Sequence, residues 1–226
     1  LEQELARADR RVGRDADLGV AEPAVEVRSL ELVRVEHDRP AAARLGFRFG
    51  AAVWAGAGLR GFVVLGAFFL SSSLLPRLLP PADGVQAVVE KGGRRDHAQV
   101  LANGGAALVF SILHRIEPRE LWYLGFACAL AAATADTWAS EIGSRSRKPP
   151  RMILSGRTVE AGLSGGVSTL GFAASLAGAA FIAGVSVGLL ALPALLDGGP
   201  FRPAWLAYGG IVTAGGFAGS VIDSIL

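Results

Sequence analysis

The pattern of apolar and polar positions divides the chain into a polar first part and a largely apolar remainder. Residues 1–43 mix acidic residues with arginines and show little apolar periodicity, apart from a weak strand-like alternation over 25–35. From Leu45 onward, long apolar segments alternate with short polar loops. We therefore predict a polar, poorly ordered N-terminal tail over 1–43 and a polytopic membrane domain over 44–226.

The apolar segments predict an all-α membrane protein with about six transmembrane helices arranged in hairpins. The segments lie at residues 45–59, 61–76, 98–113, 121–140, 161–196 and 203–222. The first two are short, because about twenty apolar residues are needed to cross a bilayer, and they reach that length only with their flanks. We expect these two segments to form an antiparallel helical pair.

The long segment at 161–196 allows two topologies. It carries no charged residue, and at about 1.5 Å per residue it is too long for one upright span. One tilted span over residues 162–188 followed by an apolar loop would let the last segment return to the starting side. Two short spans would instead send the last segment outward. We adopt the one-span topology because an internal repeat, described below, favours it.

Composition and charge support a membrane protein and exclude several other classes. Of the 226 residues, 51% are hydrophobic, and 19 of the 42 charged side chains lie within residues 1–48. The cations are not clustered as a nucleic-acid footprint requires, so we expect no nucleic-acid partner. A single cysteine, Cys128, excludes a disulfide framework. Because Leu226 falls inside an apolar segment, we expect the sequence to be truncated at its C-terminus.

A basic, glycine-rich stretch after the second apolar segment is the first candidate for chemistry. It reads EKGGRRDHAQVLANGG over residues 90–105. Cations beside glycine backbone at the mouth of a helix can hold phosphate. The candidate phosphate-binding residues are Lys91, Arg94, Arg95, Asn103, Gly104 and Gly105. The alternative is a basic loop between two spans whose charge only fixes topology.

A second basic loop lies one hairpin further along the chain. It covers residues 141–160 and contains Arg145, Arg147, Lys148, Arg151 and Arg157. Loops separated by a full hairpin lie on the same side of a membrane, and basic loops favour the cytosol. We therefore expect both basic loops and the N-terminus on the cytosolic face of a multi-pass protein.

A short internal repeat links the two hairpins that follow the first basic loop. Asn103-Gly104-Gly105 opens one, and Ser164-Gly165-Gly166 opens the other. The first hairpin ends in DTWASEIG at 136–143, and the second ends in GSVIDSIL at 219–226. Each end places an Asp and a Ser within one helical turn. Gly165, Gly166 and Ser168 are accordingly candidates for phosphate binding, although small residues there also suit helix packing.

Asp136 is the most informative single residue, because an ionisable group inside a span is costly and is usually functional. Glu141 lies five residues further on, and Asp223 occupies the equivalent place in the second hairpin. We expect Asp136, Glu141 and Asp223 to carry Mg²⁺, which takes a few carboxylate oxygens together with water and substrate phosphates. The alternative for each is a solvated residue near a helix end. Asp96, beside the cations of the first basic loop, is expected to assist or to orient a cation.

Four motifs together resemble a family of integral membrane proteins long labelled domain of unknown function ninety-two. The motifs are EKGGRRDHAQVLANGG, ADTWASEIG, GGVSTLGFAAS and GFAGSVIDSIL, at 90–105, 135–143, 165–175 and 216–226. The family includes transmembrane protein 19 of animals and a plant phytyl-phosphate kinase. The resemblance covers about residues 45–226, while residues 1–43 match nothing known in the family.

The resemblance implies a membrane-embedded phosphotransferase. By analogy with the plant kinase, it would transfer a phosphoryl group from a nucleoside triphosphate, with CTP expected, to an isoprenoid monophosphate at the cytosolic face. Asp96, Asp136, Glu141 and Asp223 would be the catalytic residues. An ion-coupled transporter and a non-catalytic membrane scaffold stay open as alternatives, since intramembrane carboxylates and glycine-broken helices also occur in carriers.

Overall fold

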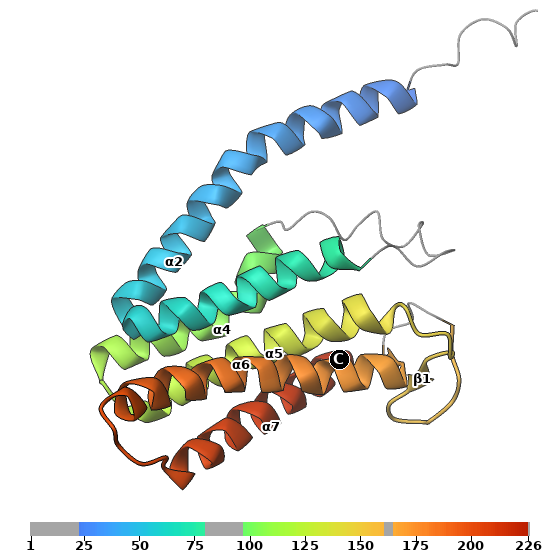
Figure 1. The fold of residues 1–226 in the computed structure, drawn as a ribbon. Helices are drawn as coiled ribbons and strands as arrows, with labels where there is room; N and C mark the ends of the chain where they lie inside the picture. Colours follow the sequence, from blue (N-terminus) through green and yellow to red (C-terminus); the bar gives the residue numbers. More distant parts are fainter. Residues whose placement is uncertain (1–22, 80–96, 161–164, 226) are drawn as a thin grey trace, which may run out of the picture. The chain divides into compact units, whose positions relative to one another are not determined.

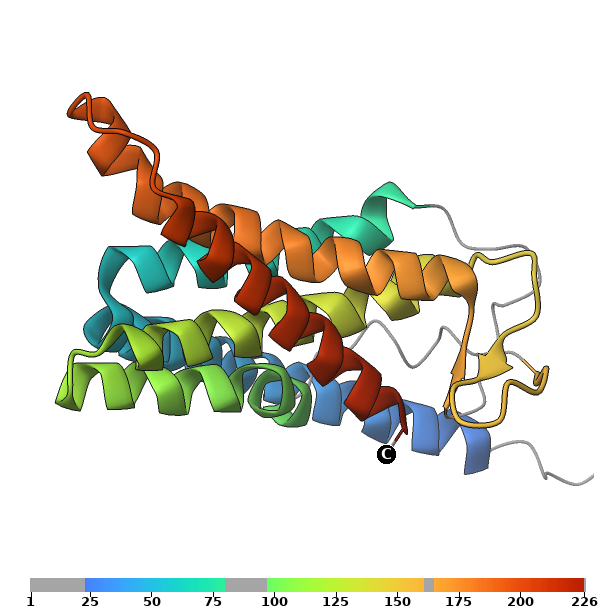
Figure 2. The same ribbon diagram turned by 90° about the horizontal axis from the view of Figure 1, so that it is seen from below.

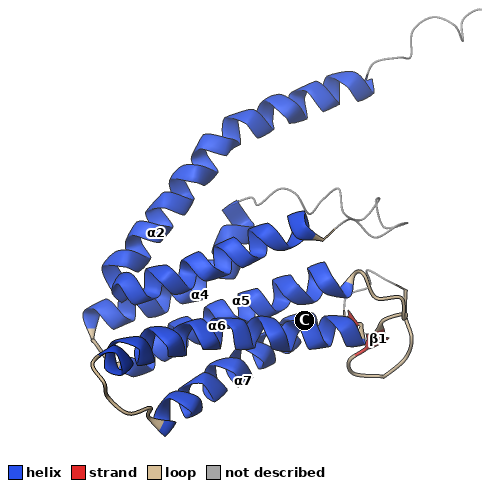
Figure 3. Cartoon of the chain, viewed as in Figure 1, coloured by secondary structure: helices blue, strands red, loops and turns tan. Residues whose placement is uncertain are grey.

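The computed structural model describes residues 23–79, 97–160 and 165–225, and it is almost entirely helical (Figure 1; Figure 3). Side-chain positions are described for residues 44–79, 103–160 and 165–225. The helices are α2 (Pro23–Leu78), α4 (His97–Ile116), α5 (Glu120–Gly143), α6 (Thr169–Leu196) and α7 (Pro203–Ile225). Two strands of two residues each, β1 (Arg151–Met152) and β2 (Gly166–Val167), pair in an antiparallel manner. The predicted all-α class is confirmed.

The chain divides into two compact units, Leu1–Leu45 and Gly46–Leu226. In the first unit, the described residues from Pro23 onward belong to helix α2. The weak strand expected over residues 25–35 is therefore wrong. Glu, Arg and Leu, which fill much of this stretch, are strong helix formers, and this propensity outweighs a short alternation of valines with polar residues.

Helix α2 contains a sharp bend at Gly58. This glycine has φ 64° and ψ −160°, a left-handed conformation that disfavours any side chain. Beyond the bend the chain turns back, because the rings of Trp54 and Phe62 meet edge to face with centroids 5.3 Å apart. The helical pair predicted for residues 45–59 and 61–76 is therefore present, with Gly58 as the turn.

Helix α5 is the central helix of the second unit, and it contacts α4, α6 and α7 (Figure 2). Many of its buried residues are alanines, and several facing residues are glycines. A Cβ added at Gly216 of α7 would lie 2.5 Å from the Cβ of Ala131, and one added at Gly178 of α6 would lie 3.0 Å from Thr134 O. Small residues thus let these three helices approach closely, as membrane helices often do.

Three helices are long and apolar enough to cross a membrane, as judged by length and composition: Arg44–Leu78, Thr169–Leu196 and Pro203–Ile225. The expected count of six spans is not confirmed. The one-span topology agrees with the structure, because a single helix, α6, fills the long apolar segment and α7 packs back along it. The outer loop predicted after residue 188 begins only after Leu196, since α6 continues through Pro193.

The loop between α5 and α6 is more ordered than the sequence indicated. Met152 N donates to Arg157 O at 2.9 Å, and Ile153 N donates to Gly165 O at 3.1 Å. Gly156 and Gly165 both have positive φ, at 66° and 80°, which lets the chain reverse on each side of β1. The strands were not predicted, because two-residue strands leave no detectable periodicity.

Candidate functional site

Three helix ends meet at one end of the second unit, and we call this region the polar end. It comprises residues 136–143 of α5, 165–175 at the start of α6, and 220–225 of α7. Helices α5 and α6 touch here, since a Cβ added at Gly143 would lie 2.8 Å from the Cα of Gly171. Helices α6 and α7 meet through a buried hydrogen bond of 3.1 Å from Ser175 Oγ to Ser220 Oγ.

The polar end brings Asp136 and Asp223 together. Helices α5 and α7 run parallel here, because a Cβ added at Gly219 would lie 2.8 Å from the Cβ of Ala132. Moving four residues along each helix leads to Asp223 and Asp136. The two carboxylates are close enough for their charges to interact. Asp136 is half-buried and Asp223 is exposed, and the described residues offer neither a hydrogen bond nor an ion pair.

Glu141 occupies a different face of α5. Five residues correspond to a rotation of about 140° around a helix, so its side chain leaves α5 on another side from that of Asp136. Its backbone oxygen accepts hydrogen bonds from Ser144 Oγ and the Arg145 guanidinium. Within the described ranges, no group of three or more His, Cys, Asp and Glu side chains is arranged to hold a metal ion. The closest approach to the predicted metal set is the pair Asp136 and Asp223, and metal binding stays a prediction.

Ser168, Gly165 and Gly166 lie at the entrance to α6. Ser168 is the N-cap of the helix: its Oγ accepts from Gly171 N at 3.0 Å and donates to Gly143 O at 3.1 Å. The hydroxyl therefore fixes the start of α6 against the end of α5. Gly166 belongs to β2, and Gly165 packs against Met152 with room for only a very tight Cβ. Their predicted role in phosphate binding is not tested by this packing.

A serine that the sequence analysis did not select, Ser175, is part of the same arrangement. Besides its bond to Ser220, the neighbouring Ser224 Oγ donates to Ser220 O at 2.9 Å. These hydroxyls are buried or half-buried and satisfy one another directly beside the carboxylate pair. Ser175 follows Ser168 by seven residues, which places both on one helical face, and that spacing could have identified it.

Asn103, Gly104 and Gly105 lie inside α4, whose first residue is His97. They occupy the second and third turns, where backbone N–H groups are bonded within the helix. Gly104 is a packing residue, because a Cβ there would lie 2.5 Å from the ring of Phe49. Packing accounts for Gly104, whereas phosphate binding at these three residues stays a prediction.

Lys91, Arg94, Arg95 and Asp96 lie outside the described residues. The described residue before their loop, Leu79, is tied to the polar end by Arg145. One nitrogen of the Arg145 guanidinium donates to Leu79 O at 2.9 Å, and the other donates to Glu141 O. The sequence analysis treated Arg145 only as a loop charge, although cations often bind the unpaired carbonyls at a helix end.

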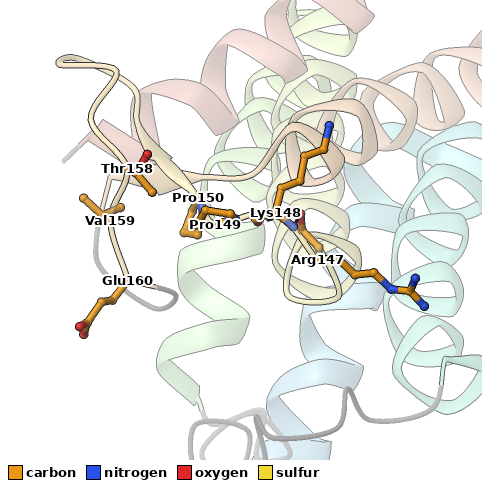
Figure 4. Close-up of a pocket in the computed structure, with 8 residues that line it drawn as sticks. Arg147, Lys148, Pro149, Pro150, Thr158, Val159 and Glu160 are labelled. Carbon is orange, nitrogen blue, oxygen red and sulfur yellow. Dashed lines mark hydrogen bonds between the residues drawn. The ribbon is translucent and has the colours of Figure 1, made fainter.

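The ordered loop after α5 contains a hollow of about 640 Å³, which we call the loop hollow. Its lining residues are Ser146, Arg147, Lys148, Pro149, Pro150, Thr158, Val159 and Glu160. Figure 4 shows Arg147 and Lys148 on one side, and Thr158 and Glu160 on the other. Val159 N donates to Pro150 O at 3.0 Å, which holds the two sides together. In the described part of the chain, neither Arg147 nor Lys148 forms an ion pair.

Comparisons with known proteins identify relatives in three kinds of organism. The chain is 31% identical over 169 residues to an uncharacterised membrane protein of Methanocaldococcus jannaschii, which covers 75% of this chain and 64% of that protein. It is 31% identical to Protein PGR of Arabidopsis thaliana, over 64% of this chain and 49% of the relative. It is 28% identical to the chloroplastic Protein VTE6 of the same plant, over 62% of this chain and 44% of the relative. An uncharacterised membrane protein of Synechocystis is 31% identical over 65% of this chain and 59% of its own length.

The chain thus spans about half to two thirds of the length of these curated relatives. No solved structure matches it significantly. Residues 32–226 match the family described as "Integral membrane protein DUF92", which includes all five described helices in whole or in part. The chain therefore belongs to the integral membrane protein family DUF92.

Proposed function

We propose that the protein is a membrane-embedded phosphotransferase that transfers a phosphoryl group from a nucleoside triphosphate to an isoprenoid monophosphate. The observation that carries this proposal is the pair Asp136 and Asp223, which meets at a helix end without a counter-ion among the described residues. The basic loop that begins at Arg145 directly follows α5, so cations for phosphate lie beside the carboxylates. The resemblance to a family with a plant phytyl-phosphate kinase supports the reaction class.

The reaction needs alignment and charge neutralisation more than covalent chemistry by the protein. An oxygen of the isoprenoid monophosphate would attack the γ-phosphorus of the donor. The bond from that phosphorus to the β-phosphate oxygen would break, releasing a nucleoside diphosphate and an isoprenoid diphosphate. CTP is the donor that we propose, by analogy with the plant kinase.

Asp136 and Asp223 would hold Mg²⁺, which is commonly bound by one or two carboxylates together with waters and substrate phosphates. The ion would supply positive charge to the transferring phosphoryl group. Without a cation, two neighbouring carboxylates would repel each other and an incoming phosphate. The two residues fit such an ion because both are unpartnered and partly accessible. Glu141 and Asp96 are candidates to assist from adjoining positions.

The isoprenoid chain would lie against the apolar surfaces of the helices. Exposed apolar side chains cover α6 and α7, including Phe172, Leu176 and Ile222 near the polar end. These surfaces also face the lipid bilayer in an integral membrane protein. The head group would then reach the carboxylates at the proposed cytosolic face, where Lys91, Arg94 and Arg95 would bind phosphate oxygens.

The position of Asp136 favours this proposal over an ion-coupled carrier. Carriers place their ion-binding groups near the middle of the bilayer. Asp136 lies seven residues before Gly143, the last residue of α5, which corresponds to about 10 Å along the helix. It is therefore nearer to the end of this 24-residue helix than to its middle.

An assay of the purified full-length protein with labelled CTP, Mg²⁺ and a series of prenyl monophosphates tests the proposal. We expect label to appear in a prenyl diphosphate, and we expect Asp136→Asn to abolish the reaction. Absence of turnover with every monophosphate and every common nucleoside triphosphate would end the kinase proposal. Exchange of ions across vesicles in its place would favour a carrier.

A further inference from the structure

The loop hollow has a chemical composition that the proposed phosphotransfer has not yet used. Its cations, Arg147 and Lys148, are exposed and have no ion pair in the described residues. Its other side carries a hydroxyl from Thr158 and a carboxylate from Glu160. The volume of about 640 Å³ lies within the range of small-molecule sites. A hollow with cations on one side and a carboxylate on the other suits a ligand that has both acidic and donor groups.

The backbone around the hollow is held in place before any ligand arrives. The bond from Val159 N to Pro150 O and the bridge between Arg151 and Thr158 join its two sides. On the cationic side, Ser146 Oγ donates to Lys148 O at 3.0 Å. Pro149 and Pro150 fix their own φ angles between the two sides. Such order reduces the entropic cost of binding.

The hollow also lies beside the carboxylate pair, as a donor site for phosphotransfer must. It starts three residues after Gly143, the last residue of α5. At its far side, β1 pairs with β2, whose Gly166 lies two residues before the N-cap of α6. A Cβ added at Gly165 would lie 3.6 Å from Ser224 O, next to Asp223.

We propose that the loop hollow binds the nucleoside triphosphate donor, with Arg147 and Lys148 pairing with phosphate oxygens and Glu160 accepting hydrogen bonds from the sugar hydroxyls. Guanidinium and ammonium groups are the usual protein partners of phosphate. A carboxylate that accepts from a ribose is a recurring feature of nucleotide sites. This inference rests on the proposed function, because it gives the donor of that reaction its place.

The same cations could instead attract anionic lipid head groups. Two features favour the nucleotide. The hollow is framed by paired backbone rather than being a flat, mobile basic segment. It also carries Glu160, and a carboxylate at a lipid-binding surface would repel the head groups. Figure 4 shows the Glu160 carboxylate directed away from the Arg147 guanidinium, so the acid does not neutralise that cation.

Equilibrium binding of labelled CTP with Mg²⁺ to the full-length protein, in phosphatidylcholine nanodiscs, tests this site. We expect the double variant Arg147→Gln, Lys148→Gln to weaken CTP binding at least about tenfold, because two charge-assisted contacts are lost. The matched control is Arg202→Gln, an exposed arginine before α7, which should bind CTP like the wild type. Glu160→Gln should weaken CTP binding while leaving competition by inorganic triphosphate unchanged.

The outcomes separate this inference from the proposed function. CTP binding that the double variant weakens, in a protein that transfers no phosphoryl group, would keep the hollow and end the kinase proposal. Unchanged CTP affinity in the double variant, or no CTP binding by the wild type, would overturn the hollow. Loss of binding only to phosphatidylglycerol vesicles would assign these cations to the lipid surface and overturn it as well.

Discussion

The two ends of the helical unit Gly46–Leu226 treat their charged groups differently. At the end opposite to the polar end, α4 and α5 are joined by a short turn whose polar groups are satisfied locally. Arg119 and Glu117 form an ion pair of 2.6 Å, and Trp122 Nε1 donates to Glu117 at 3.2 Å. His114 Nδ1 lies 3.0 Å from Arg119 O. This end closes a hairpin and leaves little charge for a ligand.

At the polar end the hydroxyls are satisfied and the charges are not. Ser168, Ser175 and Ser220 bond to neighbouring helices, while Asp136 and Asp223 have no counter-ion among the described residues. Arg147 and Lys148 likewise lack ion pairs there. A protein that keeps unpaired charge at one end only has that end available for a charged ligand. The central claim is therefore that the basic loops and the carboxylates share one membrane face.

Removing one carboxylate should break this contrast most strongly. We expect Asp136→Asn to lower phosphotransfer at least about a hundredfold, which corresponds to about 2.7 kcal/mol. The melting temperature in detergent without Mg²⁺ should not fall, because the substitution removes a repulsion between like charges. Asp197→Asn, at the opposite end, is the control and should keep wild-type activity. Equal losses in both variants would refute the assignment of chemistry to the polar end.

The second prediction concerns the close packing that positions Asp223 against Asp136. Gly216→Leu would drive a side chain into Ala131, so we expect it to destabilise the protein by about 1–3 kcal/mol. The control is Gly210→Leu in the same helix, where a Cβ would meet nothing within 4 Å. Thermal unfolding in detergent gives both values. If the two variants melt alike, the packing of α7 on α5 is not as described.

The helix cap at the polar end should give a smaller effect. Ser168→Ala removes the acceptor for Gly171 N and the donor to Gly143 O, and loss of an N-cap costs about 1 kcal/mol. Ser168→Thr retains a hydroxyl and should recover most of that stability. A threonine variant as unstable as the alanine variant would show that the cap is not responsible. The same melting experiment measures both.

The smallest effect is expected from the buried serine pair. Ser175→Ala leaves Ser220 without its side-chain partner, and a hydrogen bond between membrane helices is worth about 0.6 kcal/mol on average. Ser186→Ala in the same helix is the matched control, because that buried hydroxyl has no hydrogen-bond partner. We expect the control to be neutral or slightly stabilising. A larger loss in the control would remove the distinction between bonded and unbonded serines.

Much of this architecture could be predicted from hydropathy and spacing. The bend at Gly58, the single helix α6 and the return of α7 follow from the lengths of apolar segments and their glycine and proline breaks. The proximity of Asp136 and Asp223 was expected from the repeated Asp and Ser spacing at the ends of two hairpins. These features depend on local sequence and on simple helix geometry, so the sequence alone indicates them.

Other features depend on contacts that one sequence does not reveal. The clamp from Arg145 to Leu79 joins residues 66 positions apart, and nothing local distinguishes this arginine from its basic neighbours. The role of Gly104 as a packing residue required knowing that Phe49 lies opposite. The loop hollow arises from two-residue strands, which are too short to leave a pattern. Tertiary packing determines all three.

Labelling with a membrane-impermeant maleimide in sealed vesicles tests the central claim most directly. In a Cys128→Ser background, single cysteines would replace Leu79 and Ser155, beside the two basic loops, and Asp197 at the opposite end. We predict that Leu79→Cys and Ser155→Cys are labelled from the same side and Asp197→Cys from the other. Labelling of Leu79→Cys and Ser155→Cys from opposite sides would contradict a single polar face.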